Sequence, residues 1–479
     1  MKQTDFDIQK ITGLTPDSRS VKQGYLFAAL PGTKSDGRNF IPTAIHNGAI
    51  AILTQTGTEL PAGTKNVDLI TDDNPRRALA LMAADFYDRQ PEFIAAVTGT
   101  NGKTSTVHFT KQLWKALGEK AASIGTLGVR APGLVRSASM TTPDPVALHA
   151  ELADLAAVGV THLAMEASSH GLDQHRLDGV HVSAAAFTNL TRDHLDYHAD
   201  MESYFEAKAR LFTAILKKGG AAVLNADIPE YEELRTRAKK AGHKIISVGR
   251  NGEDIHITAI VPLPEGQKIS FSVLKRDFEM TLPLVGEFQV MNALCALALV
   301  IAEEPKSKKR TEKLVKALEN LKGVPGRLQL ISGHPHGAAI YIDYAHTPNA
   351  LENALKALRP HTDGTLVCLF GCGGDRDKGK RPVMGKIAHD LADLVIVTDD
   401  NPRSEDPARI RSEIMQGAEG ATETPDRRMA IQKSISALRK GDVLVIAGKG
   451  HEQGQVFSDR TEPFDDAHEA QSAILQIIH

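Results

Sequence analysis

The chain has 479 residues, of which 42% are hydrophobic and 24% are charged, and its formal net charge is −3. This length predicts two to four domains, and the composition is that of an ordinary globular protein. The slight negative charge argues against nucleic acid as the main partner, because nucleic-acid-binding proteins present a dominant basic surface.

The first part of the chain, residues 1–88, has apolar runs at residues 25–30 and 49–54 with turn-rich stretches between them. This alternation predicts a small α/β domain. A helical pattern over residues 77–87 leads out of it, and Pro91 marks the boundary.

Strands alternate with helices over residues 89–323. Strand-like apolar runs lie at residues 93–99, 162–167, 184–190 and 221–225, and helical periodicity lies at residues 201–216 and 292–302. This order is typical of a parallel sheet with helices on both faces. A β-rich stretch at residues 255–285 interrupts the alternation.

Two glycines and a proline at residues 323–327 predict a hinge. Beyond it, strand-like runs lie at residues 339–344, 365–370, 394–398 and 443–447, and a final helical pattern covers residues 466–478. These features predict a C-terminal Rossmann-like α/β domain over residues 324–479. The chain as a whole is therefore predicted to be an α/β protein of three domains.

The loop of residues 96–104, Ala-Val-Thr-Gly-Thr-Asn-Gly-Lys-Thr, stands between a predicted strand and an amphipathic segment. Backbone N–H groups in such a loop can hold phosphate oxygens. Lys103 is then placed to reach the β- and γ-phosphates, and the Thr104 hydroxyl can ligate Mg²⁺. Val97 replaces the first glycine of the standard pattern, and a plain strand-to-helix turn is the alternative. The glycine-rich turn favours phosphate binding, and it predicts a central ATPase domain of the P-loop type.

Other strands of this domain also end in polar residues. Glu166 ends a strand at a position suited to a metal ligand, with a solvated or capping glutamate as the alternative. Residues 193–198, Asp-His-Leu-Asp-Tyr-His, follow another strand and favour a catalytic role over ordinary surface polarity. Lys208 lies in a helix, where its spacing alone predicts a side chain that faces solvent.

Four strands of the C-terminal domain end in charged turns, most of them rich in glycine. These turns are residues 343–348, 371–381, 399–403 and 448–452. Ligands of open α/β sheets bind beyond the carboxyl ends of the strands. The turns therefore predict a polar, arginine-rich face that suits a substrate bearing carboxylates.

The cysteines and the apolar runs indicate the cellular compartment of the protein. Cys295, Cys368 and Cys372 lie in or beside apolar runs, which predicts buried thiols in a reducing compartment. Residues 1–10 lack the apolar core of a signal peptide, and the longest uncharged apolar run, residues 293–302, is too short to span a bilayer. We therefore expect a cytoplasmic protein without membrane insertion.

Several of these motifs together resemble the ATP-dependent Mur ligases of peptidoglycan synthesis. They are Thr-Gly-Thr-Asn-Gly-Lys-Thr (98–104), Glu-Ala-Ser-Ser-His (166–170), Asp-His-Leu-Asp-Tyr-His (193–198) and Asp-Tyr-Ala-His-Thr-Pro (343–348). The resemblance runs from Asp17-Ser18-Arg19 to residues 448–452, and it is closest to the members that add diaminopimelate. It implies that ATP phosphorylates the D-glutamate carboxylate of UDP-N-acetylmuramoyl-L-alanyl-D-glutamate, and that an amine of diaminopimelate attacks the acyl phosphate. A monomer is expected.

The resemblance also assigns residues to ATP and metal. Those implied to bind ATP are Gly99, Thr100, Asn101, Gly102, Lys103, Thr104, Ser105, Asn292, Arg327 and Asp343. Lys103, Glu166, His194 and Lys208 are the implied catalytic residues. Thr104 and Glu166 would serve one Mg²⁺, while His194 and Lys208, carried as a carbamate, would serve a second. Gln289 stands where most relatives have asparagine, which is a mild departure.

The same resemblance places the two other substrates. The first domain would bind UDP around Ser18, and the muramoyl peptide would contact Thr141, Thr142, Ser168, Gln174 and Arg176. Diaminopimelate would contact Arg376, Asp400, Asn401, Pro402, Arg403, Gly448 and Glu452.

The motif Asp-Asn-Pro-Arg occurs twice, at residues 73–76 and 400–403. Diaminopimelate carries one carboxylate more than lysine, and arginine can bind it through two hydrogen bonds. We assign the second copy to that carboxylate. The first begins a helix, where proline at an early position is ordinary, and we assign it to structure.

Three alternatives differ from this hypothesis. A lysine-adding ligase of the same family is the nearest, and Arg403 argues against it. A folylpolyglutamate synthase would share the core and the reaction type, but would not be expected to carry the UDP-binding domain or the second motif. A nucleotide-gated binding protein without catalysis would be expected to lack Lys103, Glu166 or Lys208, and all three are present.

Overall fold

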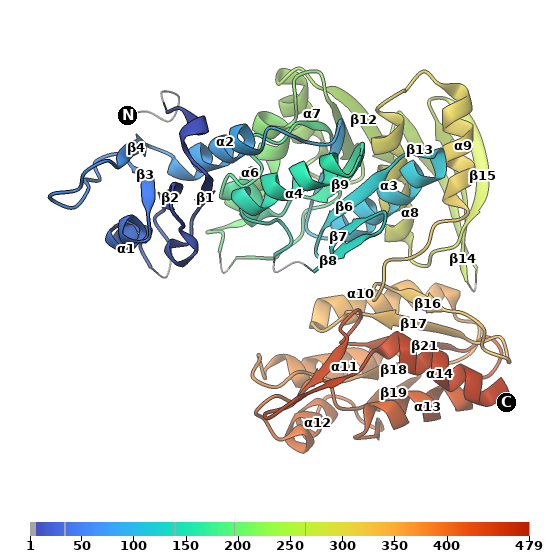
Figure 1. Ribbon diagram of the computed structural model, residues 1–479. Helices are drawn as coiled ribbons and strands as arrows, with labels where there is room; N and C mark the ends of the chain where they lie inside the picture. Colours follow the sequence, from blue (N-terminus) through green and yellow to red (C-terminus); the bar gives the residue numbers. More distant parts are fainter. Residues whose placement is uncertain (1–5, 33–34, 138–139, 196, 264, 479) are drawn as a thin grey trace. The chain divides into compact units, whose positions relative to one another are not determined.

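The structure is a computed structural model that describes residues 6–32, 35–137, 140–195, 197–263 and 265–478 (Figure 1). The chain divides into two compact units. The first comprises Met1–His256 and Met291–Val315, and the second comprises Ile257–Val290 and Lys316–His479. The domain limits at residues 88 and 323 stay predictions.

The first unit begins with a small parallel sheet, which confirms the predicted α/β start of the chain. Its strand order is β1 (Gly13–Thr15), β2 (Tyr25–Ala29), β3 (Ala49–Gln55) and β4 (Asp68–Asp72). Short helical elements are η2 (Ile8–Lys10), η3 (Ser18–Ser20), η4 (Gly37–Phe40) and α1 (Ile41–His46). Successive side chains of β2 point to opposite faces of the sheet and therefore enter two separate hydrophobic cores. Leu26 packs in one core with Leu79 of α2 (Pro75–Tyr87), and Phe27 packs in the other with Ile41 of α1.

A larger sheet follows in the order β12-β11-β10-β5-β9-β6-β7-β8. Neighbouring strands are parallel from β12 to β6, and β7 and β8 form an antiparallel edge. The strands are β5 (Phe93–Thr98), β6 (Ala121–Gly125), β7 (Gly128–Ala131), β8 (Leu134–Arg136), β9 (His162–Glu166), β10 (Val182–Phe187), β11 (Ala221–Asn225) and β12 (Lys244–Gly249). The parallel strands β9, β10 and β11 are buried along their whole length, which explains why most of their residues are apolar.

Helices cover this sheet, as the alternating pattern predicts. They are α3 (Lys103–Leu117), α4 (Pro145–Ala157), α5 (Ser169–Asp173), α6 (Met201–Arg210), the π-helical η5 (Leu211–Ile215) and α7 (Tyr231–Lys240). One core joins Ile94 of β5 to Leu152 of α4 and Phe205 of α6, while α3 packs on β5, β6 and β9 outside that core. The single helix predicted over residues 201–216 is therefore α6 followed by η5.

Strand β13 (Ile255–Leu263) pairs with β12 at its first residues and then enters the second unit. There it lies beside β14 (Gly266–Val273), which forms an antiparallel hairpin with β15 (Arg276–Leu282). This confirms the predicted β-rich stretch. Helices α8 (Glu287–Ile301) and α9 (Lys308–Leu318) follow, and the predicted hinge at residues 323–327 is irregular backbone.

The C-terminal sheet has the order β16-β17-β21-β18-β19-β20, with β16 antiparallel and the rest parallel. Its strands are β16 (Gln329–Ile331), β17 (Ala339–Asp343), β18 (Leu366–Phe370), β19 (Leu394–Val397), β20 (Thr422–Glu423) and β21 (Val443–Ala447), and β22 (Gly454–Val456) pairs with β23 (Thr461–Pro463). The helices are α10 (Pro348–Leu358), η6 (Arg359–His361), α11 (Lys380–Leu391), α12 (Pro407–Met415), α13 (Arg427–Ala437) and α14 (Asp466–Ile478).

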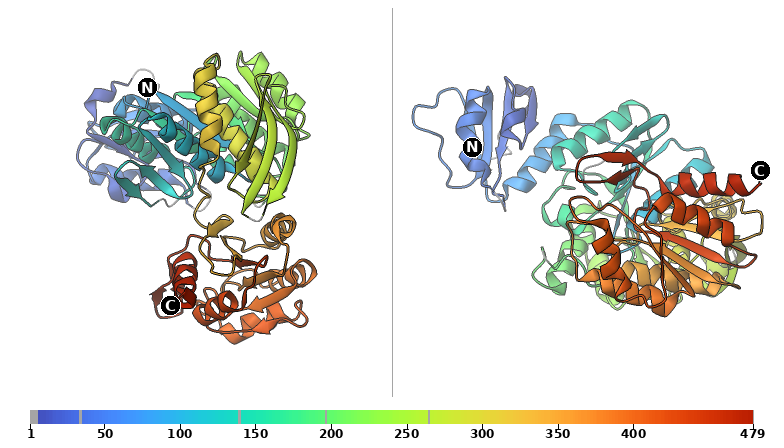
Figure 2. Two further views of the ribbon diagram at one scale, coloured as in Figure 1. Left: turned by 90° about the vertical axis from the view of Figure 1, so that its right-hand side faces the viewer. Right: turned by 90° about the horizontal axis from the view of Figure 1, so that it is seen from below.

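Helices lie on both faces of this sheet (Figure 2), and each face has its own hydrophobic core. Helices α10, α11 and α12 contribute to one, and α13 and α14 contribute to the other. This doubly wound arrangement confirms the predicted C-terminal α/β domain, and it directs four turns to the carboxyl ends of its strands.

Candidate active site

A glycine loop joins the end of β5 to the start of α3. Gly99 (φ 141°) and Gly102 (φ 85°) have backbone angles that favour glycine. A Cβ atom at Gly99 would lie 2.0 Å from Thr188 Oγ1, and one at Gly102 would lie 2.3 Å from Asn292 Oδ1. Both positions therefore require glycine, and the loop can offer backbone N–H groups to phosphate oxygens at the N-terminus of α3.

The residues after β10 hold this loop in place. Asn101 N donates to Asn189 Oδ1 at 2.8 Å, and Thr100 Oγ1 accepts from Thr191 N at 2.9 Å. Ser105 is buried in the first turn of α3. The loop is thus braced by a second strand end of the same sheet.

Lys103 and Lys208 donate to the same carbonyl group. Lys103 Nζ lies 2.9 Å from Gly99 O and 2.8 Å from Thr100 O, and Lys208 Nζ lies 2.8 Å from Gly99 O. Lys208 is only 1% exposed, and its ammonium group lies 4.3 Å from the centre of the Tyr204 ring. The prediction from spacing that Lys208 faces solvent is wrong, because the side of α6 that carries it packs against the glycine loop.

The surroundings of Lys208 disfavour its charged form. Burial lowers the pKa of Lys208 well below its usual value, and the positive charge of Lys103 lowers it further, while Asp193 opposes the shift. A buried lysine in its neutral form is a nucleophile. Lys208 is therefore chemically distinct from a surface lysine.

Glu166 ends β9 inside the protein and is 1% exposed, which excludes the alternative of a solvated glutamate. It accepts hydrogen bonds from Thr126 N at 2.8 Å and from the Thr104 hydroxyl. Burial raises its pKa, although the charge of Lys103 and these hydrogen bonds lower it in part. The adjacent Glu166 carboxylate and Thr104 hydroxyl supply the oxygen ligands that Mg²⁺ prefers, so this pair fits the predicted metal.

His194 lies near this site but in a more open place. Its side chain is 45% exposed, its Nε2 atom lies 3.6 Å from Asp193 Oδ2, and its ring lies beside those of His170 and Tyr204. Asp196 lies outside the described residues. In the described part of the chain, no group of three or more histidine, cysteine, aspartate or glutamate side chains could hold a metal. A second metal at His194 and Lys208 stays a prediction.

Five of the residues predicted to contact the muramoyl peptide form one network beside Glu166. The Thr142 hydroxyl donates to Glu166 O at 3.0 Å and accepts from Ser168 Oγ at 3.0 Å. Arg176 donates to Thr142 O at 2.7 Å and to Gln174 Oε1 at 2.8 Å. Thr141 joins the network through Thr126, with their hydroxyl oxygens 3.2 Å apart.

Ser18 lies apart from this network in the N-terminal sheet. It is buried in the 3₁₀ turn η3, and its carbonyl oxygen accepts a hydrogen bond from Asn47 Nδ2 at 3.0 Å. The role of Ser18 in binding UDP stays a prediction.

The first Asp-Asn-Pro-Arg motif forms the start of α2. Asn74 caps the helix by accepting from Arg77 N at 3.0 Å, and Pro75 occupies the first turn. Arg76 donates to Pro31 O at 2.6 Å. The side chain of Asn74 also reaches His175, with its Nδ2 atom 2.9 Å from His175 Nε2. These contacts give the motif a structural role.

Asp343 ends β17 in the second unit, where it is buried. It accepts from Leu328 N at 2.7 Å and from Ala345 N at 2.8 Å. Burial raises its pKa to about 6, although these hydrogen bonds and the nearby Arg327 oppose the shift. Arg327 stacks over Tyr344, 4.9 Å from the ring centre. Gln289, also in this unit, is buried near the start of α8.

A cavity of about 610 Å³ opens at the carboxyl ends of the strands in the second unit. Six of the residues predicted to bind diaminopimelate line it: Arg376, Asp400, Asn401, Arg403, Gly448 and Glu452. Pro402 is buried and is not among the lining residues. The cavity is also lined by Tyr344, His346, Asp377 and Lys380, which were not predicted to bind the substrate although all four stand in the charged turns.

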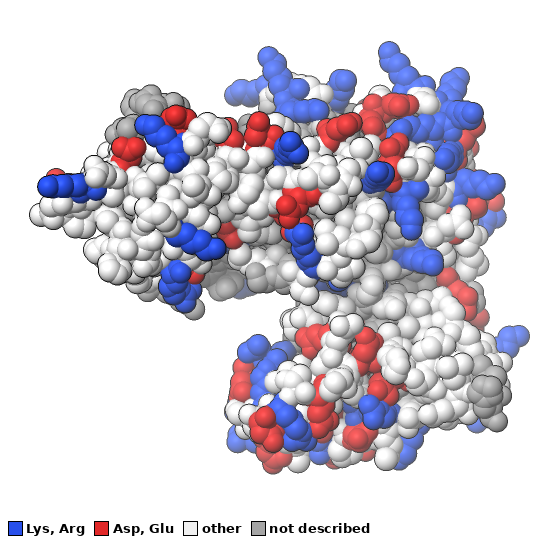
Figure 3. All heavy atoms as spheres, viewed as in Figure 1, with Lys and Arg blue, Asp and Glu red and all other residues white. Residues whose placement is uncertain are grey.

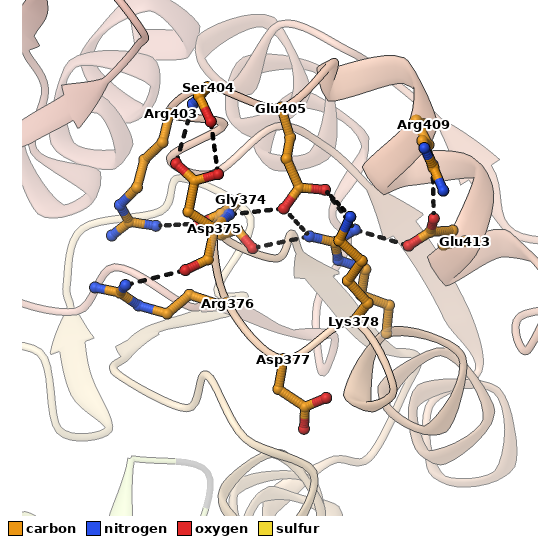
Figure 4. Close-up of polar contacts among 12 residues, drawn as sticks. Gly374, Asp375, Arg376, Asp377, Lys378, Arg403, Ser404, Glu405, Arg409 and Glu413 are labelled. Atoms are coloured by element: carbon orange, nitrogen blue, oxygen red, sulfur yellow. Dashed lines mark hydrogen bonds and ion pairs between the residues drawn. The ribbon is translucent and has the colours of Figure 1, made fainter.

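Polar contacts tie the turn after β18 to the turn after β19 (Figure 4). Arg403 Nη1 donates to Gly374 O at 2.8 Å, and Ser404 Oγ donates to Asp375 Oδ1 at 2.6 Å. Glu405 accepts from Asp375 N at 2.7 Å and from the buried Arg381. These bonds fix the turns that carry Arg376 and Arg403, so the cavity presents both arginines, together with Lys380, alongside the carboxylates of Asp377, Asp400 and Glu452.

Basic and acidic side chains both occur across the face shown in Figure 3.

No helix among the described residues has the length and apolar character needed to cross a membrane. Cys295, Cys368 and Cys372 are buried and unpaired, as predicted.

Comparisons with known proteins agree on one family. Three family models match in succession: Mur ligase family, catalytic domain, at residues 10–87; Mur ligase middle domain at residues 97–300; and Mur ligase, glutamate ligase domain, at residues 326–450. A UDP-N-acetylmuramoyl-L-alanyl-D-glutamate–2,6-diaminopimelate ligase from Rhizobium meliloti is 52% identical over 97% of this chain and 94% of its own length. The ligase of the same name from Brucella melitensis is 51% identical over the same shares. A solved structure with this name has a TM-score of 0.76 and 37% identity, and it covers 98% of this chain and 96% of its own.

Proposed function

The chain belongs to the Mur ligase family, and from this premise we propose that it joins diaminopimelate to UDP-N-acetylmuramoyl-L-alanyl-D-glutamate at the expense of ATP. It is an amide ligase of peptidoglycan precursor synthesis that releases ADP and phosphate. The observation that carries the choice of amino acid is the C-terminal cavity, where Arg376 and Arg403 stand beside Asp400 and Glu452. This mixture of charges suits an amino acid with two carboxylates and two ammonium groups.

The reaction joins two anions before it forms the amide. The D-glutamate carboxylate attacks the γ-phosphorus of ATP, the bond to the β-phosphate oxygen breaks, and ADP leaves. The uncharged amine of diaminopimelate then adds to the acyl phosphate carbon, loses a proton and expels phosphate. Lys103 and the backbone N–H groups of the glycine loop would offset the phosphate charge through both steps. Thr104 and Glu166 would hold Mg²⁺, which when bound neutralises further phosphate charge.

The nucleotide and the muramoyl peptide would occupy neighbouring parts of the first unit. The adenine is assigned near Asn292, which lies against the glycine loop at Gly102. A connected polar network lies next to Glu166 and consists of Thr141, Thr142, Ser168, Gln174 and Arg176. This connection supports the assignment of these residues to the muramoyl peptide. We assign UDP to the N-terminal domain around Ser18, and we assign Arg327 and Asp343 to the nucleotide.

Lys208 is proposed to carry a carbamate. Its neutral amine would form a C–N bond with the carbon of CO₂ and release one proton, which yields an anionic oxygen ligand for the second metal beside His194. The support is the burial of Lys208 and its placement beside Lys103, both of which lower its pKa. An anionic carbamate would also offset the charge of Lys103.

We place the reaction in the cytoplasm, in keeping with the three unpaired cysteines. The protein is taken to act as a monomer.

Phosphate release from ATP tests the proposed function. Purified protein should release phosphate only when the UDP-linked dipeptide and diaminopimelate are both present, and omission of either should return the rate to background. Release that depends on folate and glutamate instead would support the folylpolyglutamate synthase alternative. Release without any amino acid would show that the protein is not a ligase of this kind.

A further inference from the structure

Lys449 lies behind the wall of the C-terminal cavity. It follows β21, the strand between β17 and β18 in the sheet, and its side chain is 0% exposed. The cavity lining includes its neighbour Gly448 but not Lys449 itself. Burying an ammonium group costs free energy unless it is paired and hydrogen-bonded, so its partners indicate what it does.

Among the described residues, three polar partners surround the Lys449 ammonium group, and all three line the cavity. Its Nζ atom donates to Asn401 Oδ1 at 2.7 Å, and it lies 3.6 Å from Asp400 Oδ1 and 3.7 Å from Glu452 Oε2. Asp400 and Asn401 belong to the turn after β19, whereas Glu452 belongs to the turn after β21. One buried cation therefore joins two of the four turns that form the cavity.

Lys449 and the backbone N–H of Val456 together set which way the Asn401 amide points. Asn401 Oδ1 accepts from Lys449 and from Val456 N at 3.0 Å, so two donors occupy the oxygen. The Nδ2 atom must then face the other way, where it donates to Glu452 Oε2 at 2.8 Å. A flipped amide would place N–H groups against both donors. The bond to Lys449 thus sets the position of Glu452 through Asn401.

The charge of Lys449 faces two carboxylates of the cavity, Asp400 and Glu452. Asp400 is buried, and within the described residues its Oδ1 atom has no hydrogen-bond partner. This buried oxygen lies 3.6 Å from Lys449 Nζ, and Asp400 is one of the residues that line the cavity. Burial lowers the pKa of Lys449, and Asp400 and Glu452 act against that shift. The two carboxylates and the lysine therefore depend on one another.

We propose that Lys449 is a positioning residue for the amino-acid substrate, which locks Asn401 and holds Asp400 and Glu452 as acceptors for the ammonium groups of that substrate. This inference rests on the proposed function. It adds a residue that would not touch the substrate but would set its affinity.

The test is steady-state kinetics on Lys449→Met, which keeps the length of the side chain and removes the charge and the donor. The KM for diaminopimelate should rise about 10-fold to 100-fold, since a hydrogen bond to a charged group is lost, while the KM values for ATP and the UDP-linked dipeptide should change by less than about twofold. Lys440→Met, at an exposed lysine just before β21, is the control and should leave all three KM values unchanged. An unchanged KM for diaminopimelate, or an equal rise in all three KM values, would overturn the inference.

A double-mutant cycle with Asn401→Ala tests the route of the effect. If Lys449 acts through Asn401, the rise in KM for the double variant should be smaller than the product of the two single effects. Multiplying effects would show that Lys449 does not act through Asn401, and would overturn the proposal.

Lys449→Gln covers the case in which Lys449→Met does not fold. It keeps an N–H donor without a charge, so its KM for diaminopimelate should lie between those of the wild type and Asn401→Ala. A wild-type KM for diaminopimelate in Lys449→Gln would refute the claim that the charge of Lys449 helps to position Asp400 and Glu452. Failure of the wild type to use diaminopimelate at all would instead refute the proposed function.

Discussion

Replacing Arg403 with alanine should weaken the use of diaminopimelate far more than the use of lysine. The guanidinium group is held by hydrogen bonds from Nη1 to Gly374 O at 2.8 Å and to Asn401 O at 3.4 Å. Arg403 also lines the cavity, where its guanidinium group can donate to the distal carboxylate of diaminopimelate. Loss of a buried, charged hydrogen bond costs about 2–5 kcal/mol, which corresponds to a loss of roughly 30-fold or more in kcat/KM. Lysine lacks that carboxylate and should lose much less.

The first copy of the motif supplies the matched control. Arg76 donates to Pro31 O at 2.6 Å within the N-terminal domain, so Arg76→Ala should lower the free energy of unfolding by about 1 kcal/mol and leave the selectivity unchanged. The assay is kcat/KM for diaminopimelate and for lysine in both variants, with urea unfolding alongside. If Arg76→Ala changes the ratio of the two substrates and Arg403→Ala does not, the two motifs have been assigned the wrong way round.

Three further predictions concern the glycine loop, the lysine beside it and the second unit. Lys208→Ala should lower kcat by at least about 100-fold, and added bicarbonate should not restore it. ¹³C NMR with labelled CO₂ should show a carbamate signal in the wild type only. Wild-type turnover in the variant would contradict the carbamate proposal. Gly102→Ala should cost about 1–3 kcal/mol of backbone strain and also raise the KM for ATP, because its Cβ would lie 2.3 Å from Asn292 Oδ1. Gly118→Ala, also at positive φ but with open space around it, should leave that KM unchanged, and equal KM values in the two variants would refute the steric argument. Burial raises the pKa of Asp343 from 3.8 to about 6, so the folded state binds the proton more tightly than the unfolded state does. The free energy of unfolding of the wild type, relative to that of Asp343→Asn, should therefore fall as pH rises from about 4 to 6 and level off above. Urea unfolding of both proteins across this range measures the difference, and a relative gain in stability with rising pH would contradict the prediction.

Much of the fold could be predicted because its strands are buried and parallel. Residues 221–224 and 443–447 are apolar throughout, since both faces of their sheets are covered, and the structure places β11 and β21 there. The glycine loop could be predicted for a similar reason, because a turn between a strand and a helix needs glycine where φ is positive.

Burial of single charged residues could not be predicted from spacing. Lys208 follows the pattern of an exposed helix position, and only its contact with the carbonyl of Gly99 shows why it is buried. Lys449 and Arg381 stand in glycine-rich, charged segments that predict exposed turns, yet both are buried because Asn401 and Glu405, in the turn after β19, supply their partners. Local sequence records the residue type but not the distant group that it pairs with.

The most direct test is the mass of the product formed from an equimolar mixture of diaminopimelate and lysine with ATP and UDP-N-acetylmuramoyl-L-alanyl-D-glutamate. The arginines of the C-terminal cavity predict a product that has gained diaminopimelate with the loss of one water, together with one phosphate for each amide formed. A product that has gained lysine, or consumption of ATP without any new UDP-linked product, would contradict the assignment.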